Sequence, residues 1–223
     1  RLYRKGGWPM KKVSILLLLL SVISLPLIAQ NIIYSNLKEL LTQDGDTVAV
    51  LRIEKRSRNQ IVLTGGADYR ITAGDDESIG KRLKKRCFAV RDENGNLYLN
   101  CRKLRYKKLR FGAWYAPAVQ LDNRIYFCAM PLGSVVGGHF IEEDDVKLGG
   151  NIGDALAASS LVTKRVCYEL NAVTGKIEFL NKDKMLDLLK KYPELKQAYL
   201  KDDSQEAKHT FKYLLILRDK QKQ

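Results

Sequence analysis

Short β-prone runs alternate with polar turns through the middle of the chain, and the clearest pair flanks an Asn-Gly dipeptide. Residues 87–91 and residues 97–101 are both β-prone, and the polar segment between them contains Asn94-Gly95. Asn and Gly tolerate the positive φ values that tight hairpin turns require. The pattern therefore predicts a β-hairpin centred on Asn94.

Further hydrophobic runs predict strands on both sides of this hairpin. Residues 113–116 and 124–129 form a second aromatic-rich pair across a turn at 121–123. Residues 171–175 end in a glycine and predict the turn of a third hairpin. Val, Ile, Leu and aromatic residues also mark the remaining predicted strands, at 47–54, 60–64, 69–72, 162–170 and 176–180.

Apolar residues recur at helical spacing near both ends of the chain. A short helix is predicted at 35–41, with Ser35 as its N-cap. Near the C-terminus a helix over 185–192 follows Asn181, which suits an N-cap, and Pro193 begins another. A last helix is predicted after the Asp203 and Glu206 capping box.

These elements predict an α+β fold: an antiparallel, hairpin-built β-sheet with a short N-terminal helix and C-terminal helices packed on it. Residues 30–223 are expected to form one domain, with 30–180 mainly β and 181–223 helical. The glycine-rich segment 131–160 is predicted to be a loop followed by a short helix. Its Gly-xxx-Gly spacings leave a membrane-contacting element as the alternative.

Residues 10–29 have the composition of a secretory signal peptide. Lys11-Lys12 precede an apolar run from Val13 to Ala29. A membrane anchor is the less favoured alternative, because the run is short for a span and no basic residues follow it. We expect cleavage before Gln30 and export to the periplasm, the outer membrane or the exterior, with membrane contact through the signal peptide only. Residues 1–9 are expected to lie upstream of the native start at Met10.

The positive charge of the chain indicates anionic partners. The formal net charge is +14, and about +9 remains after Ala29, because five basic and no acidic residues precede Gln30. The excess is concentrated beside the first hairpin, where we expect one positive surface that binds an anionic lipid, an acidic glycan or a protein partner. Solubility and protection of strand edges are the alternative roles. The predicted binding residues are Lys84, Lys85, Arg86, Arg102, Lys103, Arg105, Lys107, Lys108 and Arg110.

Four cysteines offer two disulfides in an oxidising compartment. Cys87 and Cys101 lie symmetrically about Asn94, so the hairpin sets them opposite each other and a bridge between them is predicted. Cys128 and Cys167 form a second bridge in this scheme. In the alternative, all four cysteines are buried as small hydrophobic residues.

The sequence contains little that indicates catalysis. His139 follows a Gly-Gly pair, and it is the only catalytic candidate, because a thiol or carboxylate held against it would complete a nucleophile or acid–base pair. The chain lacks a Gly-x-Ser-x-Gly elbow, a calcium loop and a phosphate-binding Gly-Lys-Ser/Thr loop. We therefore expect no metal site and no cofactor. Nucleic acid is not an expected partner of an exported protein.

Several segments resemble an uncharacterised family of secreted proteins from Bacteroidota. The resemblance rests on the signal-peptide end 28–30 and on motifs at 87–90, 97–102, 111–116 and 125–127, and it covers most of the mature chain. It implies an exported domain of a Gram-negative envelope, and it implies no activity and no catalytic residues.

Three hypotheses follow. The first is a non-catalytic envelope protein whose basic hairpin contacts an anionic surface or partner. The second is a hydrolase or transferase that uses His139, and the third is a structural protein-interaction module with an exposed apolar surface.

Overall fold

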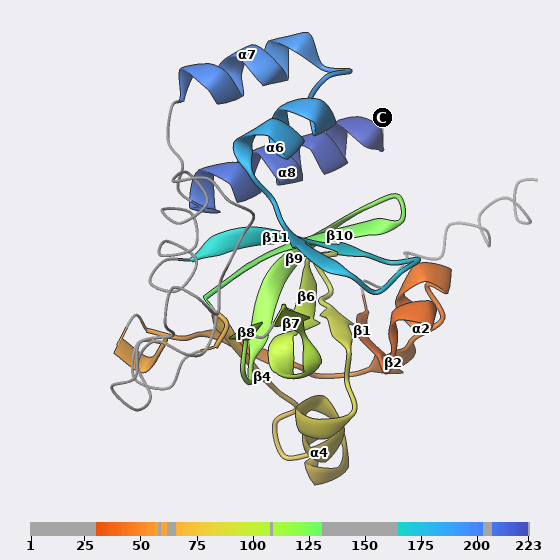
Figure 1. The fold of residues 1–223 in the computed structure, drawn as a ribbon. Coiled ribbons are helices and arrows are strands. Elements are labelled where there is room, and N and C mark those ends of the chain that lie inside the picture. The colour runs from red at the N-terminus through yellow and green to blue at the C-terminus, as the bar shows by residue number, and fades with distance from the viewer. Residues whose placement is uncertain are drawn as a thin grey trace, which may run out of the picture.

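The computed structural model describes residues 30–57, 59–61, 66–107, 109–130, 165–202 and 207–222. In these ranges a large antiparallel sheet carries helices on its outer surfaces, which confirms the predicted α+β class (Figure 1). The leader 10–29, the glycine-rich segment 131–160 with His139, and the capping box at 203–206 lie outside the described residues. None of the helices in the described part of the chain has the length and hydrophobicity to span a bilayer.

The main sheet has the strand order β12-β11-β10-β9-β6-β5-β1-β2, with β4 pairing both β3 and β9. Every pairing is antiparallel. The strands are β1 (Asn31–Tyr34), β2 (Asp46–Val48), β3 (Arg52–Lys55), β4 (Tyr69–Thr72), β5 (Ala89–Arg91), β6 (Leu97–Asn100), β9 (Tyr115–Leu121), β10 (Arg124–Ala129), β11 (Val166–Asn171) and β12 (Ile177–Phe179). A separate two-stranded hairpin consists of β7 (Arg105–Tyr106) and β8 (Leu109–Arg110).

The helices are short. They are α2 (Leu37–Thr42), α4 (Glu77–Lys85), the 3-10 helix η1 (Cys101–Lys103), α6 (Lys182–Leu188), α7 (Pro193–Lys201) and α8 (Ala207–Gln221). Asn181 caps α6, as predicted, because its side chain accepts a hydrogen bond from the Lys184 amide at 2.9 Å. Pro193 is the first residue of α7, which also agrees with the prediction.

The hairpin predicted around Asn94 is present as β5 and β6. Ala89 pairs with Leu99 and Arg91 pairs with Leu97, so the register is symmetric about Asn94. The turn is held by Asp92, whose Oδ1 accepts from the backbone amides of Asn94 and Asn96 at 3.0 and 2.8 Å. Gly95 supplies the positive φ of 78°.

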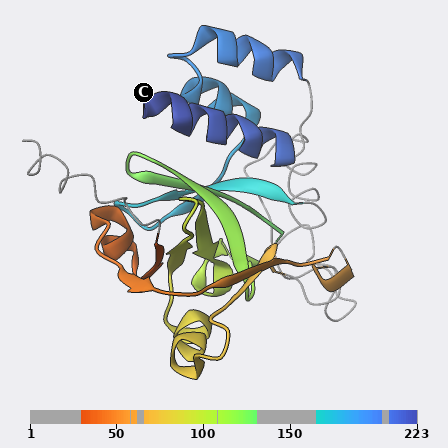
Figure 2. The same ribbon diagram turned by 180° about the vertical axis from the view of Figure 1, so that it is seen from behind.

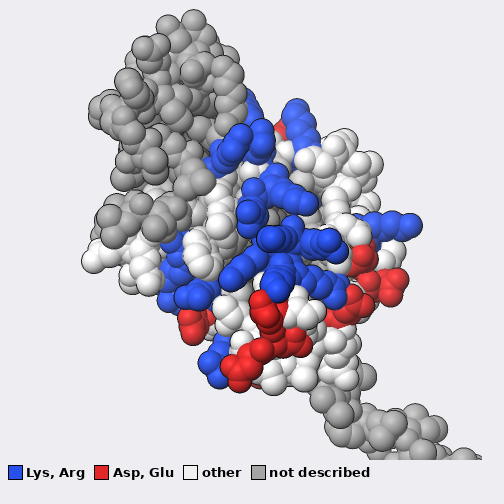
Figure 3. Space-filling model, turned by 90° about the horizontal axis from the view of Figure 1, so that it is seen from below, with Lys and Arg blue, Asp and Glu red and all other residues white. Residues whose placement is uncertain are grey.

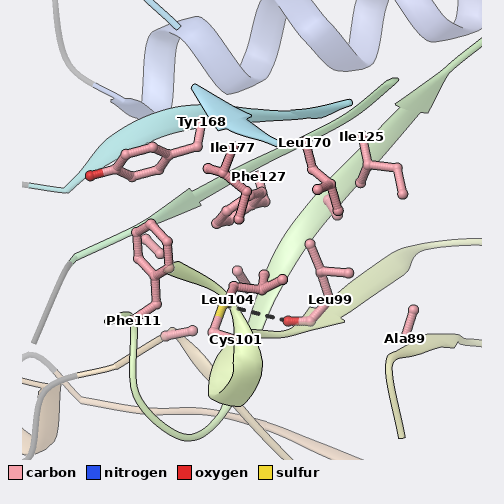
Figure 4. Close-up of a cluster of buried hydrophobic side chains, with 14 of the residues drawn as sticks. Ala89, Leu99, Cys101, Leu104, Phe111, Ile125, Phe127, Tyr168, Leu170 and Ile177 are labelled. Atoms are coloured by element: carbon pink, nitrogen blue, oxygen red, sulfur yellow. Dashed lines mark hydrogen bonds between the residues drawn. The ribbon is translucent and has the colours of Figure 1, made fainter. Parts of the chain in front are cut away.

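The sheet bends around β9. Residues 115–118 of β9 pair with β6, whereas residues 118–121 pair with β10. The two halves of the sheet therefore curl toward each other and enclose a core on the concave side. Figure 4 shows Phe127 and Tyr168 from one half facing Leu99 from the other half and Phe111 from the loop after β8. The Phe111 and Tyr168 rings pack edge to face with centroids 4.7 Å apart.

Two helical layers cover the convex side at opposite ends of the molecule (Figures 1 and 2). Helices α6, α7 and α8 bury Met185, Tyr199 and Leu214 against one half, where Tyr126 of β10 contributes. Helix α4 covers the other half with Leu83, which joins a cluster of β1, β4, β5 and β6 residues. In both layers the helices bury their apolar faces against the sheet, and this burial holds them in place.

Several local predictions are wrong. Helix α4 occupies a segment between residues 72 and 87 for which no element was predicted, and Asp76 caps it by accepting from the Ile79 amide at 2.9 Å. The single strand predicted at 47–54 is divided into β2 and β3, and residues 60 and 61 are helical where a strand was predicted. The N-cap of α2 is Asn36, not Ser35, because the Asn36 side chain accepts from the Glu39 amide at 3.0 Å.

Of the two disulfides considered from the sequence, only the second is present. Cys128 and Cys167 form a disulfide across β10 and β11, whereas Cys87 and Cys101 are free and buried. The hairpin register is as predicted, but the β5 ladder begins only at Ala89. Cys87 therefore belongs to the cluster beneath α4, and Cys101 belongs to the concave core. With their side chains in different clusters, the two thiols form no bridge.

Candidate functional site

The C-terminal end of α4 is fastened to the strand that leads into η1. The last carbonyls of a helix have no partner inside the helix and need donors from elsewhere. Here the Leu83 carbonyl accepts from Asn100 Nδ2 at 3.2 Å and from Tyr115 Oη at 2.8 Å, and the Lys84 carbonyl accepts from Arg102 Nη1 at 3.0 Å. Two segments that are distant in sequence are thereby held side by side.

Asn100 is the central residue of this junction, and sequence reasoning missed its role. Its Nδ2 also donates to the Cys87 carbonyl at 2.9 Å, and its Oδ1 accepts from the Arg102 amide at 3.1 Å. The side chain is 8% exposed. Its amide therefore joins the end of α4, the start of the hairpin and the first turn of η1. The only signal in the sequence is a polar residue that interrupts the apolar run of β6.

This junction brings four of the predicted binding residues around one small hollow. Lys85 and Arg86 come from the end of α4, and Arg102 and Lys103 come from η1. All four side chains are exposed, as is the neighbouring Lys84. The hollow has a volume of about 60 Å³, and its remaining lining residues are Ser35, Cys87, Phe88, Asn100 and Leu104.

The other predicted binding residues lie on the β7–β8 hairpin, which follows η1. Arg105 and Arg110 are directly opposed in the register, and Lys107 occupies the turn with a φ of 53°. The Lys107 ammonium lies 5.7 Å from the centre of the Tyr106 ring. None of these three residues lines the hollow. Lys108 lies outside the described residues.

The cations around the hollow differ from their neighbours in how they are compensated. Lys81 pairs with Glu77 at 2.7 Å, and Arg82 pairs with Asp46. Within the described ranges, no ion pair neutralises the predicted binding residues at the end of α4, on η1 or on β7–β8. Figure 3 shows Lys and Arg side chains gathered over the middle of the face on the α4 side, with acidic side chains along one margin.

The cysteine at this hollow is not suited to nucleophilic chemistry. Burial raises the pKa of the Cys87 thiol to about 11, so the thiolate is scarce at neutral pH. The Cys87 Sγ also donates to the Ala89 carbonyl at 3.2 Å. The arrangement can therefore attract and hold an anion, and it offers no activated nucleophile of its own.

A second hollow lies at the opposite end of the sheet, between the β11–β12 turn and α6. There Arg124 pairs with Glu169 at 2.9 Å, and Glu178 accepts from both Lys176 and Lys184. The hydrogen bonds from Lys184 and Lys176 lower the pKa of Glu178 to about 2. Positive and negative groups compensate one another in this hollow, which indicates an ion-pair network that fastens α6 to the sheet.

The other functional hypotheses find little in the described residues. Large apolar residues that are exposed there are Val50, Val173 and Leu200, and they are scattered over separate elements instead of forming a patch. No group of three or more His, Cys, Asp or Glu side chains in the described part of the chain could hold a metal ion. His139 lies outside that part, so its catalytic role stays a prediction.

Comparison with known proteins gives a family without an assigned activity. The model of a family of unknown function (DUF6563) matches residues 32–221. These residues include the sheet apart from Asn31 at the start of β1, and they include α4, η1 and the three C-terminal helices. No curated protein and no solved structure matches the chain at a significant level. The match spans most of the sequence, and the chain therefore belongs to this family of unknown function.

Proposed function

We propose that the protein is an exported, non-catalytic envelope protein that uses the cations of α4, η1 and the β7–β8 hairpin to bind an anionic surface or partner. We call these residues the basic face; its described members are Lys84, Lys85, Arg86, Arg102, Lys103, Arg105, Lys107 and Arg110. The observation that carries the proposal is the hydrogen bond from Arg102 to the Lys84 carbonyl, which joins the two halves of the face.

Charge alone would supply the affinity of this face. No large exposed apolar side chain of the described residues belongs to α4, η1 or β7–β8, so insertion into a membrane is not expected to contribute. Uncompensated like charges on one face raise the local concentration of anions and steer their approach. Binding is then expected to weaken strongly as salt screens the charges.

The disulfide supports the export part of the proposal. Disulfides persist in oxidising compartments and are rare where thiols are kept reduced. The Cys128–Cys167 bridge is buried between β10 and α8, where both cysteines are 3% exposed. The signal-peptide composition of residues 10–29 agrees with the same destination.

The test is sedimentation of the mature chain with vesicles of phosphatidylcholine that contain phosphatidylglycerol. A triple variant, R102E/K103E/R105E, reverses charge on the basic face, and K190E/K191E/K201E makes the same net change in the C-terminal helical layer. We expect the wild type and the second variant to bind at low salt and to dissociate at about 1 M salt, where the Debye length is about 3 Å. Equal binding by both variants would contradict the proposal.

A further inference from the structure

The hollow between α4 and η1 has the size and the donors for one compact anion. We propose that it binds a single phosphate group of the phosphomonoester type, presented on a lipid headgroup. This inference rests on the proposed function, because it names the chemical class of ligand at the same basic face. It adds a specific site to what would otherwise be attraction between two charged surfaces.

The volume limits what can enter. The hollow measures about 60 Å³, and a water molecule occupies about 30 Å³ of liquid. The space therefore suits one compact tetrahedral oxyanion, whereas a sugar ring or a peptide segment would extend out of it into solvent. An acidic glycan could contact the rim of the hollow but could not fill it.

One of the four cations that line the hollow, Arg102, is anchored before any ligand arrives. Arg102 is anchored through one Nη1 hydrogen bond to the Lys84 carbonyl, and the guanidinium keeps further N–H groups for an anion. Its own backbone amide is fixed by Asn100. Lys85, Arg86 and Lys103 are the other cations that line the hollow. The anchored Arg102 guanidinium loses less conformational entropy on binding than a free surface side chain does.

Ser35 adds a neutral donor from a different part of the chain. The residue lines the hollow, and its Oγ accepts a hydrogen bond from Arg82 Nη2 at 2.9 Å. The bond from Arg82 uses one of the two lone pairs of the Ser35 hydroxyl oxygen, and the hydroxyl hydrogen can donate to a phosphate oxygen. Because the Ser35 hydroxyl is uncharged, its hydrogen bond would contribute to recognition of the phosphate group independently of charge attraction.

A phosphomonoester fits this environment better than a diester. Its second pKa is near 6, so it carries about −1.5 to −2 charge at pH 7 and offers three acceptor oxygens. A diester carries one negative charge and has two substituents. Neither substituent fits in a hollow of this size. Four cationic side chains around one anion favour the ligand with the higher charge and the larger number of free oxygens.

The experiment compares vesicles of phosphatidylcholine that contain either phosphatidic acid, a monoester, or phosphatidylglycerol, a diester, at matched zeta potential. We expect the mature chain to bind phosphatidic acid about tenfold more tightly. Ser35→Ala, which leaves the net charge unchanged, should reduce this preference by the contribution of one hydrogen bond and keep binding to phosphatidylglycerol. Arg105→Gln, outside the hollow, should weaken binding to both lipids equally.

Each outcome separates this inference from the proposed function. Equal affinity for the two lipids would overturn the phosphate site and leave the basic face intact, whereas no binding to either would overturn both. An unchanged preference in Ser35→Ala would also overturn the site. Displacement of the protein from phosphatidic acid by submillimolar inorganic phosphate would overturn the lipid assignment, because the hollow would then recognise soluble phosphate.

Discussion

Cys128 and Cys167 are directly paired across β10 and β11, and their disulfide packs against the first turn of α8. The two sulfur atoms lie 3.7 and 3.4 Å from the Ala207 carbonyl oxygen. The bond therefore joins two neighbouring strands, β10 and β11, at the point where the longest helix begins. It also encloses the chain between the two strands, with a sequence separation of 39.

Loss of this bridge is expected to destabilise the fold. In the chain-entropy account, a closed loop of this length is worth about 3–4 kcal/mol of unfolding free energy. Reductant should therefore lower the denaturant midpoint of the wild type. The double variant C128A/C167A should start from the lower value and not respond to reductant. A wild-type midpoint that reductant leaves unchanged would contradict the pairing.

Truncation of the Asn100 side chain should cause one of the largest losses in the free energy of unfolding. Asn100→Ala removes two donated hydrogen bonds and the capping acceptor of η1, and it leaves the Cys87 carbonyl without its Asn100 donor. We expect a loss of about 2–4 kcal/mol in chemical denaturation. Asn94→Ala is the matched control, because Asn94 is exposed and only its backbone amide bonds to Asp92. Similar losses for the two variants would refute the central role of Asn100.

Gly66 and Gly74 provide a matched test of close packing. Both have positive φ, 85° and 58°, so an alanine is strained at either position. A Cβ at Gly66 would lie 2.4 Å from the Ala113 carbonyl oxygen, whereas a Cβ at Gly74 meets nothing within 4 Å. We expect Gly74→Ala to cost about 1 kcal/mol and Gly66→Ala to cost clearly more. Equal thermal midpoints would argue against the close approach.

The second hollow predicts a pH dependence. Because hydrogen bonds from Lys184 and Lys176 lower the pKa of Glu178 to about 2 from its ordinary value of 4.5, their stabilisation is present above pH 4.5. It is lost as the pH falls toward 2. The Glu178 side chain is 41% exposed, so the contribution should stay below about 1 kcal/mol.

NMR titration of the Glu178 carboxyl carbon measures this directly. We expect a midpoint near 2 in the wild type, and a higher midpoint in Lys184→Gln, because the first of the two donors is gone. Lys190→Gln, an exposed change in the turn after α6, should leave the midpoint where it was. A wild-type midpoint at the ordinary value would show that the ion pairs do not form in solution.

Local sequence signals predicted the elements that depend on local physics. The Asn94-Gly95 turn fixed the β5–β6 register, and Asn181 and Pro193 marked the starts of α6 and α7, because turns and helix caps are formed by neighbouring residues. The basic residues of the site were also visible as a charge cluster. Local signals could not show which of these basic residues lie together around the hollow.

The missed features depend on contacts between distant segments. Helix α4 is amphipathic but has a largely charged sequence, and it is stabilised where Leu83 packs into the cluster beneath it. The role of Asn100 requires the end of α4 to be already in position. Cys87 precedes the first residue of β5, and it lies in a different cluster from Cys101 although the predicted hairpin register is correct. The two cysteines therefore do not pair.

The account rests on the claim that an anionic ligand binds where α4 meets η1. Amide hydrogen exchange, followed by mass spectrometry with and without anionic vesicles, tests this claim most directly. We predict slower exchange on binding in residues 82–88 and 100–107, and unchanged exchange in α6, α7 and α8. Protection confined to the C-terminal helices, or no protection in α4 and η1 while the protein is bound, would contradict it.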